Sequence, residues 1–209
     1  MKKKQIIIVD DHQLFRNGLK FILTEMEDLE VIGEASNGKE FIDLLEFGIP
    51  DVVLLDINMP VMSGVEAAKI ALQKYPQLNI LVLSMFGDSK YYNTMIDTGV
   101  KGFILKDVDN RELHDAIIKV TSGGNYFSQE LLLNLIKDKT SDTSISLTKR
   151  EKEVLELICK GYSNQQISDE LFISQRTVER HRSSLLLKTE SKNSISLVVF
   201  AIKNKLVSI

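Results

Sequence analysis

Short apolar runs alternate with amphipathic stretches over the first half of the chain. Strands buried on both faces of a parallel sheet are rich in Ile, Val and Leu without alternating polar positions. Five runs have this pattern: Ile6–Val9, Val31–Gly33, Val52–Leu55, Ile80–Leu83 and Phe103–Leu105. The stretches between them repeat apolar residues at helical spacing. The alternation predicts a doubly wound α/β fold, with a five-stranded parallel sheet and helices on both of its faces.

Polar residues with N-cap spacing precede two of these amphipathic stretches. Asn37 stands three residues before Glu40, and Ser63 stands three residues before Glu66. In such a pair the first side chain accepts a hydrogen bond from the helix start, and the second reaches back to the cap. Helices are therefore expected to begin directly after Asn37 and Ser63.

The pattern from Leu147 to the C-terminus is helical throughout. Thr148, Ser163 and Ser174 each have the position of an N-cap, and Gly161 is placed to end the first of these helices. The short spacing between the second and third helices is that of a helix-turn-helix. A fourth apolar pattern, Ile195 to Val207, completes an all-α domain of four helices, and its Val198, Ala201 and Ile202 are expected to form a self-complementary patch.

These patterns divide the chain into three parts. Residues 1–124 form the α/β domain, 125–146 a short helix and a linker, and 147–209 the helix-turn-helix domain. The short apolar helix is expected at Gln129–Ile136. The stretch after it is polar, rich in Ser and Thr and without periodicity, which is typical of a linker.

Composition agrees with a two-domain globular protein. The 209 residues suffice for two domains, and the 44% of hydrophobic residues supply two cores. The single cysteine, Cys159, excludes an internal disulfide and has the apolar neighbours of a core residue. No apolar run approaches the roughly 20 residues of a membrane helix, and the run behind the basic N-terminus is too short for a signal peptide. A cytoplasmic protein without membrane contact is expected.

The net charge of −3 conceals an asymmetry between the two halves. Residues 1–140 carry 15 basic and 21 acidic side chains, whereas residues 141–209 carry 11 basic and 8 acidic ones. A mildly basic module joined to an acidic one indicates a nucleic-acid partner for the C-terminal half, although a basic surface alone is weak evidence.

Reactive side chains stand at the carboxyl ends of the predicted strands, where open parallel sheets place their sites. Strand ends carry Asp10 and Asp11, then Asp56, Ser84 and Lys106. Three carboxylates at such short separations repel one another unless a cation lies between them. Oxygen ligands of this kind suit Mg²⁺. An aspartate held there can attack phosphorus, while a lysine neutralises the incoming charge. Each aspartate alone is more simply interpreted as a solvated strand-end or capping residue. The presence of all these side chains at the strand ends favours a reactive site.

This half resembles the receiver domains of two-component response regulators. The matching residues are Asp10–Asp11, the run Leu54–Pro60 with Gly64, Ser84, and Gly102–Lys106. The resemblance covers about residues 4–122 and implies a flavodoxin-like fold.

By this resemblance, Asp56 accepts the phosphoryl group and Lys106 contacts it. Ser84 and Phe103 are the switch pair. Mg²⁺ is the implied cofactor and no other is expected. Asp11, Asp56 and the backbone carbonyl of Asn58 ligate it, and Asp10 acts mainly through water. His12 follows the acidic pair, but Mg²⁺ avoids imidazole, so His12 is interpreted as a helix-start residue.

The C-terminal half resembles the LuxR-type DNA-binding domain of the NarL/FixJ subfamily. The matching segments are Leu147–Leu155, Gly161–Asn164 with Ile167, and Ile173–His181. Base contacts are expected mainly from Arg180, Arg182 and Ser183, with Arg176 and Lys188 near phosphates. The predicted DNA-binding set, on the third helix of this domain, also includes Thr177 and Glu179. Many relatives have Lys in place of Glu179, so Glu179 either accepts from a cytosine or faces solvent. The segment Lys188–Lys192 also departs from a commoner Leu-rich ending.

The sequence therefore predicts a transcriptional regulator that is controlled by phosphorylation and is not an enzyme. The expected partners are a sensor histidine kinase as phosphodonor, double-stranded promoter DNA, a second copy in an active homodimer, and RNA polymerase. One alternative is a phosphatase of the haloacid-dehalogenase type, but it requires an aspartate where Asn58 stands. Another is a DNA-binding protein with a degenerate receiver, which the presence of the complete acidic and basic set disfavours.

Overall fold

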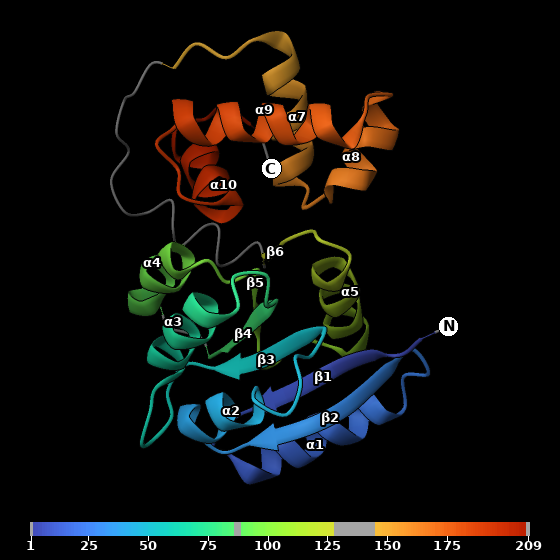
Figure 1. Cartoon of the computed structure of the whole chain (residues 1–209), viewed down its shortest axis with the longest axis vertical. Helices are drawn as coiled ribbons and strands as arrows, with labels where there is room; N and C mark the ends of the chain where they lie inside the picture. Colours follow the sequence, from blue (N-terminus) through green and yellow to red (C-terminus); the bar gives the residue numbers. More distant parts are fainter. Residues whose placement is uncertain (1, 86–88, 128–144, 208–209) are drawn as a thin grey trace.

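The computed structural model describes residues 2–85, 89–127 and 145–207. Its N-terminal part is a six-stranded sheet in which all neighbouring strands are parallel, in the order β2-β1-β3-β4-β5-β6 (Figure 1). The strands are β1 (Lys4–Val9), β2 (Leu29–Ala35), β3 (Val52–Asp56), β4 (Ile80–Ser84), β5 (Gly102–Leu105) and β6 (Tyr126–Phe127). The doubly wound α/β fold predicted from the apolar runs is confirmed.

The sheet has one strand more than the sequence pattern indicated. β6 is only two residues long and pairs with β5, Tyr126 opposite Gly102. Two residues carry no recognisable periodicity, which explains why the pattern gave five strands. Gly102 permits the pairing, because a Cβ at that position would lie 2.4 Å from the carbonyl oxygen of Tyr126. The sheet thus continues beyond residue 124.

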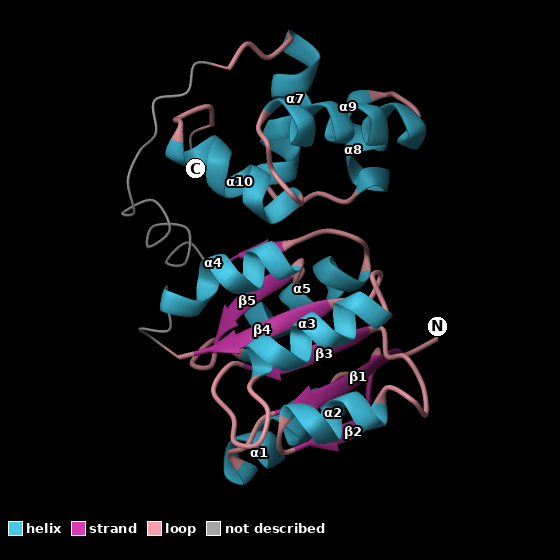
Figure 2. Cartoon of the chain, turned by 60° about the vertical axis from the view of Figure 1, so that its left-hand side comes forward, coloured by secondary structure: helices cyan, strands magenta, loops and turns pink. Residues whose placement is uncertain are grey.

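Helices cover both faces of the sheet and produce two separate cores (Figures 1 and 2). α1 (Gln13–Thr24) and α5 (Asn110–Thr121) pack on one face, where Leu23 and Ile117 are fully buried. α2 (Gly38–Leu44), α3 (Gly64–Lys74) and α4 (Ser89–Thr98) cover the other, where Phe41 and Phe103 are buried.

The N-caps expected for α2 and α3 are present. The Asn37 side chain accepts a hydrogen bond from Glu40 N at 3.0 Å, and Ser63 accepts one from Glu66 N at 3.3 Å. The return bond differs in α2, where Glu40 accepts from the backbone N–H of Ser36 rather than from that of Asn37.

The C-terminal part consists of four helices around one core. They are α7 (Lys149–Cys159), α8 (Asn164–Leu171), α9 (Gln175–Lys188) and α10 (Ser194–Lys203). Complete capping boxes begin α7 and α8, at Thr148 and Ser163, and Ser174 caps α9. Gly161 follows the end of α7 with φ 77°, as its predicted position requires. The helix expected at 129–136 lies outside the described residues.

The two domains contact each other mainly through α10, which lies against α4 (Figures 1 and 2). Ile195 of α10 is 1% exposed and belongs to the receiver-side core that contains α4. A second contact joins the end of α5 to the loop after α7, where Lys119 Nζ donates to the carbonyl of Lys160 at 2.7 Å.

Candidate functional site

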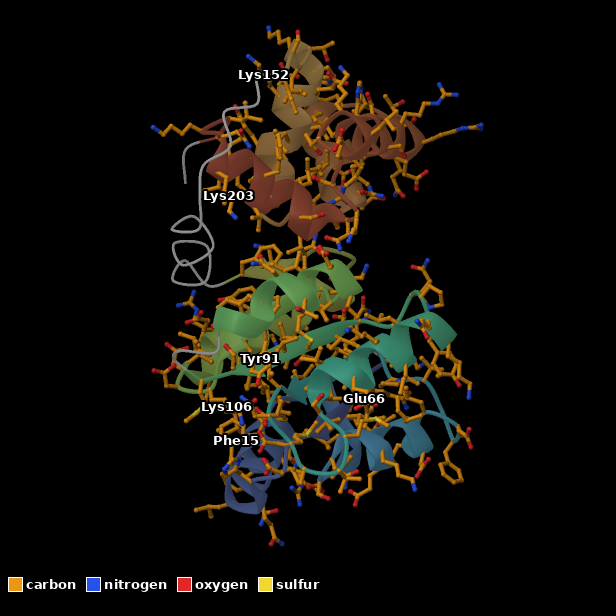
Figure 3. The ribbon with its side chains drawn as sticks, turned by 90° about the vertical axis from the view of Figure 1, so that its left-hand side faces the viewer. Phe15, Glu66, Tyr91, Lys106, Lys152 and Lys203 are labelled. Carbon is orange, nitrogen blue, oxygen red and sulfur yellow. The ribbon has the colours of Figure 1, made fainter. Side chains whose placement is uncertain are left out.

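The carboxyl ends of four strands bring the predicted site residues to one edge of the sheet. Asp10 and Asp11 follow β1, Asp56 ends β3, Ser84 ends β4 and Lys106 follows β5. In Figure 3 the side chains of Lys106 and Phe15 meet at this edge, and their cation–π contact measures 4.9 Å from Nζ to the ring centre. Phe15, on α1, was not recognised in the sequence, because a partly buried aromatic residue in an amphipathic helix signals only core packing.

Lys106 joins two of the carboxylates. Its Nζ lies 2.7 Å from Asp10 Oδ2 and 2.7 Å from Asp56 Oδ1, and both aspartates are almost completely buried. Burial raises the pKa of Asp56 above its ordinary value, although Lys106 acts in the opposite direction. Burial also opposes the charge on Lys106, but hydrogen bonds to Asp10 and Asp56 raise the pKa of its ammonium group.

The acidic residues after β1 fit a hard divalent cation. Oxygens of Asp10 and Asp11 and a ring nitrogen of His12 lie within 4.8 Å of one another. Asp11 Oδ1 is buried and accepts no hydrogen bond from the described residues; His12 Nδ1 is 3.0 Å away. A carboxylate oxygen that accepts no hydrogen bond and lies beside a second carboxylate is the kind of ligand that Mg²⁺ prefers. His12 also stands at the N-cap of α1, the helix-start position expected for it, but its side chain makes no capping bond.

Gly64, at the start of α3, packs against the backbone of Asp56 and so fixes its position. It is the first residue of α3, and its backbone N–H donates to the carbonyl of Ile57 at 2.9 Å. A Cβ on Gly64 would lie 1.9 Å from the carbonyl oxygen of Asp56. Only glycine permits this approach, so α3 begins directly against the end of β3. Asn58, predicted as a ligand through its carbonyl, lies exposed in the loop between them.

A third residue, the aromatic Tyr92, adjoins the predicted switch pair. Ser84 and Phe103 are each 1% exposed, and Tyr92 of α4 contacts both of them. The Tyr92 ring packs edge-on against Phe103 with ring centres 5.2 Å apart, and its hydroxyl lies 3.5 Å from Ser84 Oγ. The sequence did not single out Tyr92, since a tyrosine at helical spacing is normally an ordinary core residue.

The helix α9 presents part of the predicted DNA-binding set to solvent. Arg176, Glu179, Arg180 and Ser183 are exposed. Thr177 is half-buried near the helix start, where its hydroxyl lies 2.9 Å from the hydroxyl of Ser174. The receiver domain therefore leaves this face of α9 open.

Two residues of the predicted set are engaged elsewhere. Arg182 donates to the side chain of Asn164, and burial lowers the pKa of its guanidinium group. The charge of Arg182 contributes to lowering the pKa of Lys101 in the receiver domain, after burial, the main cause. Lys188 Nζ lies 2.7 Å from Glu151 Oε2 and so forms an ion pair inside the domain. Arg182 and Lys188 therefore already have partners within the protein, whereas Arg180 is exposed.

The apolar patch expected on α10 is a core rather than a surface. Val198 and Ala201 are 0% exposed and Ile202 is 8% exposed, all packed against α7 and α9 within their own domain. This expectation was wrong, because helical periodicity shows that a face is buried without showing which partner covers it. Cys159, expected in the core, packs against the same cluster, and burial raises the pKa of its thiol to about 12.

Comparison with known families identifies both halves. Residues 6–118 match the family model of the response regulator receiver domain, and residues 145–201 match the model described as bacterial regulatory proteins, luxR family. The chain belongs to the response regulators of the luxR family. Such a chain is a two-component, DNA-binding transcriptional regulator, as the sequence predicted.

Relatives extend this match over the whole chain. The transcriptional regulatory protein DegU of Brevibacillus brevis is 39% identical, over 97% of this chain and 94% of its own. The oxygen regulatory protein NreC of Staphylococcus epidermidis is 37% identical, over 97% and 98%. Among solved structures, the RcsB response regulator of Salmonella typhimurium has a TM-score of 0.61 and 25% identity, covering 97% of this response regulator and 99% of that chain. A structure of two RcsB dimers bound to two parallel DNAs matches equally well, with the same TM-score and identity.

No helix among the described residues is long and apolar enough to cross a lipid bilayer.

Proposed function

We propose that Asp56 accepts a phosphoryl group from a histidine kinase, and that this modification controls dimerisation and promoter binding. The observation that carries the proposal is the arrangement of Asp56, Asp10 and Lys106, in which one lysine lies 2.7 Å from an oxygen of each carboxylate. A cation so close to the acceptor is placed to neutralise charge on an arriving phosphoryl group.

In this reaction a carboxylate oxygen of Asp56 attacks the phosphorus of the donor phosphohistidine. The new bond joins that oxygen to phosphorus, while the phosphorus–nitrogen bond breaks and its electron pair returns to the imidazole. Lys106 exchanges part of its contact with the Asp56 carboxylate for the phosphoryl oxygens. Ser84, at the end of the neighbouring strand, then donates a hydrogen bond to one of them.

Mg²⁺ fits the same edge of the sheet. Asp11, Asp56 and the backbone carbonyl of Asn58 would ligate it, with Asp10 acting through water, and the ion would offset the charge of the carboxylates and the phosphoryl group. We expect Asp11→Ala to weaken Mg²⁺ binding at least tenfold in titration calorimetry, in line with the usual effect of removing a coordinating or supporting group. Equal affinity in the variant and the wild type would contradict this ligand set.

The open face of α9 supports DNA binding by a homodimer. RcsB binds DNA as dimers, and a two-fold site requires two recognition helices about one helical turn of DNA apart. The receiver domain leaves Arg180 and Ser183 exposed, so phosphorylation is proposed to set the pairing and orientation of two C-terminal domains. RNA polymerase is a proposed further partner at the promoter.

Labelling with acetyl phosphate and Mg²⁺, followed by intact mass, tests the acceptor. Wild type should gain one phosphoryl group, Asp56→Asn should gain none, and Asp107→Asn should match wild type. Asp107 is the matched control because it is an exposed carboxylate next to Lys106. Labelling of Asp56→Asn would overturn the assignment, and continuous turnover of the donor without a stable product would indicate a phosphatase instead.

A comparison of specific and random DNA tests the reading face. Arg180→Ala should lose discrimination by about 1–3 kcal/mol, the usual contribution of an arginine that reads a guanine edge. Lys152→Ala is the control, because Lys152 is an exposed cation on α7 rather than on the open face of α9 (Figure 3). Unchanged discrimination in Arg180→Ala would exclude base reading by this residue.

A further inference from the structure

Tyr92 connects the end of β4 to the surface that holds the C-terminal domain. Its hydroxyl lies 3.5 Å from Ser84 Oγ, the upper limit of a hydrogen bond, and both side chains are at most 3% exposed. Its ring packs edge-on against Phe103 at 5.2 Å. One side chain of α4 therefore contacts both members of the switch pair.

Ring packing alone does not account for a tyrosine at this position. A phenylalanine would make the same edge-on contact with Phe103 and bring no polar atom into the core. A buried phenolic hydroxyl requires hydrogen bonding, and the contact with Ser84 ties it to the phosphoryl site. The position of α4 and the rotamer of Ser84 are therefore linked.

One turn further along, α4 contacts the C-terminal domain. The carbonyl of Ile96 accepts a hydrogen bond from Asn193 Nδ2 at 2.6 Å. Asn193 is also the N-cap of α10, since its Oδ1 accepts from Ser196 N at 2.9 Å. Two residues later, Ile195 is buried in the core that contains Tyr92 and Ile96. We name this set, Ile96 with Asn193 and Ile195, the α4–α10 contact.

We propose that Tyr92 is a third member of the switch, which holds the α4–α10 contact in its resting arrangement through Ser84 and loosens it when Ser84 turns toward a phosphoryl group. Tyr92 is thus a positioning residue that acts through Ser84. The phosphoryl group shifts the equilibrium because it contacts Ser84 differently in the two arrangements. As Ser84 moves away, Tyr92 loses this partner, α4 adjusts, and the carbonyl of Ile96 moves relative to Asn193.

This inference rests on the proposed function, because it assumes a phosphoryl group on Asp56. Part of it is testable without phosphate. In the resting full-length protein, hydrogen–deuterium exchange of peptides covering residues 194–203 reports how firmly α10 is held. Tyr92→Phe and Ser84→Ala remove the same hydrogen bond from its two ends, and each should raise this exchange about twofold to tenfold, the usual range for one hydrogen bond.

The double variant separates coupling from simple packing. If Tyr92 acts through Ser84, Tyr92→Phe with Ser84→Ala should exchange no faster than either single variant, whereas independent structural effects would multiply. Tyr75→Phe makes the same chemical change at the end of α3 and should match wild type. Multiplying effects, or single variants identical to wild type, would overturn the proposal.

Asn193→Ser tests the other end of the connection. Serine keeps the N-cap of α10 but is too short to donate to Ile96. It should raise α10 exchange in the resting protein to the level that phosphorylated wild type reaches. If exchange is unchanged in Asn193→Ser, the hydrogen bond does not hold α10 and the proposal fails.

Phosphorylation distinguishes this inference from the function on which it rests. Wild type that gains a phosphoryl group and exchanges faster in α10, with a smaller further increase in Tyr92→Phe, supports both. Wild type that is phosphorylated with unchanged α10 exchange overturns the coupling and leaves the acceptor assignment intact. Wild type that takes no phosphoryl group contradicts the proposed function, and with it the release step.

Discussion

Each domain contains a buried carboxylate with a lysine at the same distance, yet the two sites behave in opposite ways. Asp56 Oδ1 lies 2.7 Å from Lys106, and Glu151 Oε2 lies 2.7 Å from Lys188. Asp56 is 3% exposed and Glu151 4% exposed. Nevertheless the pKa of Asp56 is raised above its ordinary value, whereas the pKa of Glu151 is lowered to about 2.

The difference lies in how many donors serve each carboxylate. Burial works against the charge of Glu151, but Lys188, Thr148 and Ser184 outweigh it with hydrogen bonds. The backbone N–H and hydroxyl of Thr148 donate at 2.8 and 2.9 Å, and the hydroxyl of Ser184 donates at 2.8 Å. Asp56 instead shares its lysine with Asp10, and burial remains the larger influence.

A buried carboxylate with a full set of donors is a structural element, whereas one with too few donors is ready to accept a new partner. Glu151 joins the start of α7 to α9 and so fixes the helix that carries Arg180. The buried charge of Asp56 is stabilised by any cation that binds it and is reduced by a new covalent bond to its oxygen. The distance to lysine alone would not have distinguished the two.

The largest expected effect contrasts the two amide substitutions. Glu151→Gln should lower the free energy of unfolding of the C-terminal domain by about 3 kcal/mol, because it removes the charge whose hydrogen bonds lower the pKa of Glu151 to about 2. Asp56→Asn, measured without divalent cations, should cost no stability at neutral pH, because the folded protein disfavours the ionised form that it removes. Urea unfolding followed by circular dichroism measures both. Equal losses of stability in the two variants would contradict this contrast between the two carboxylates.

Acid should abolish the contribution of Glu151 to the free energy of unfolding. Its pKa is about 2 in the folded protein against 4.5 ordinarily, so its stabilisation is fully present above pH 4.5. It is lost progressively as the pH falls toward 2, when the folded state must also take up the proton. The stability difference between wild type and Glu151→Gln should therefore narrow between pH 5 and pH 2, on the order of 3 kcal/mol in total. A constant difference across this interval would show that packing, rather than charge, explains the loss.

The smallest effect is expected at an exposed pair of the same length. Lys192 Nζ lies 2.7 Å from Asp97 Oδ2 across the domain contact, but both side chains are more than half exposed. Asp97→Asn should change unfolding stability by less than about 0.5 kcal/mol, because water screens such pairs. Thermal unfolding of this variant beside Glu151→Gln would show that burial, not distance, decides the contribution. A loss comparable to that of Glu151→Gln would contradict this view.

The sequence identified the edge of the sheet that carries the site because topology constrains it strongly. Parallel strands end at one edge, so Asp10, Asp56 and Lys106 had to converge once the strands were recognised. The helix caps were equally local: Thr148 and Ser163 lie three residues from their partners. These features depend on a few neighbouring residues and a fixed connection rule.

Contacts between distant elements were not predictable from the same patterns. Lys188 was expected near DNA phosphate, and nothing in its neighbourhood indicates that Glu151, 37 residues earlier, pairs with it. The apolar face of α10 was recognised, but its division between its own domain and the receiver was not. Ile195 packs on α4 while Val198 packs inward, and both follow the same helical periodicity.

The open face of α9 has a thermodynamic consequence for the order of events. The docked receiver leaves Arg180 and Ser183 in solvent. If Asp56 accepts a phosphoryl group as proposed, DNA and a phosphoryl mimic such as beryllofluoride can therefore occupy one molecule in either order. Binding free energies around such a cycle must close, so a mimic that tightens DNA binding by a given factor binds the DNA-bound protein more tightly by the same factor. Promoter DNA would then act as an effector of this protein, because the DNA-bound protein would hold the phosphoryl mimic more tightly than the free protein does.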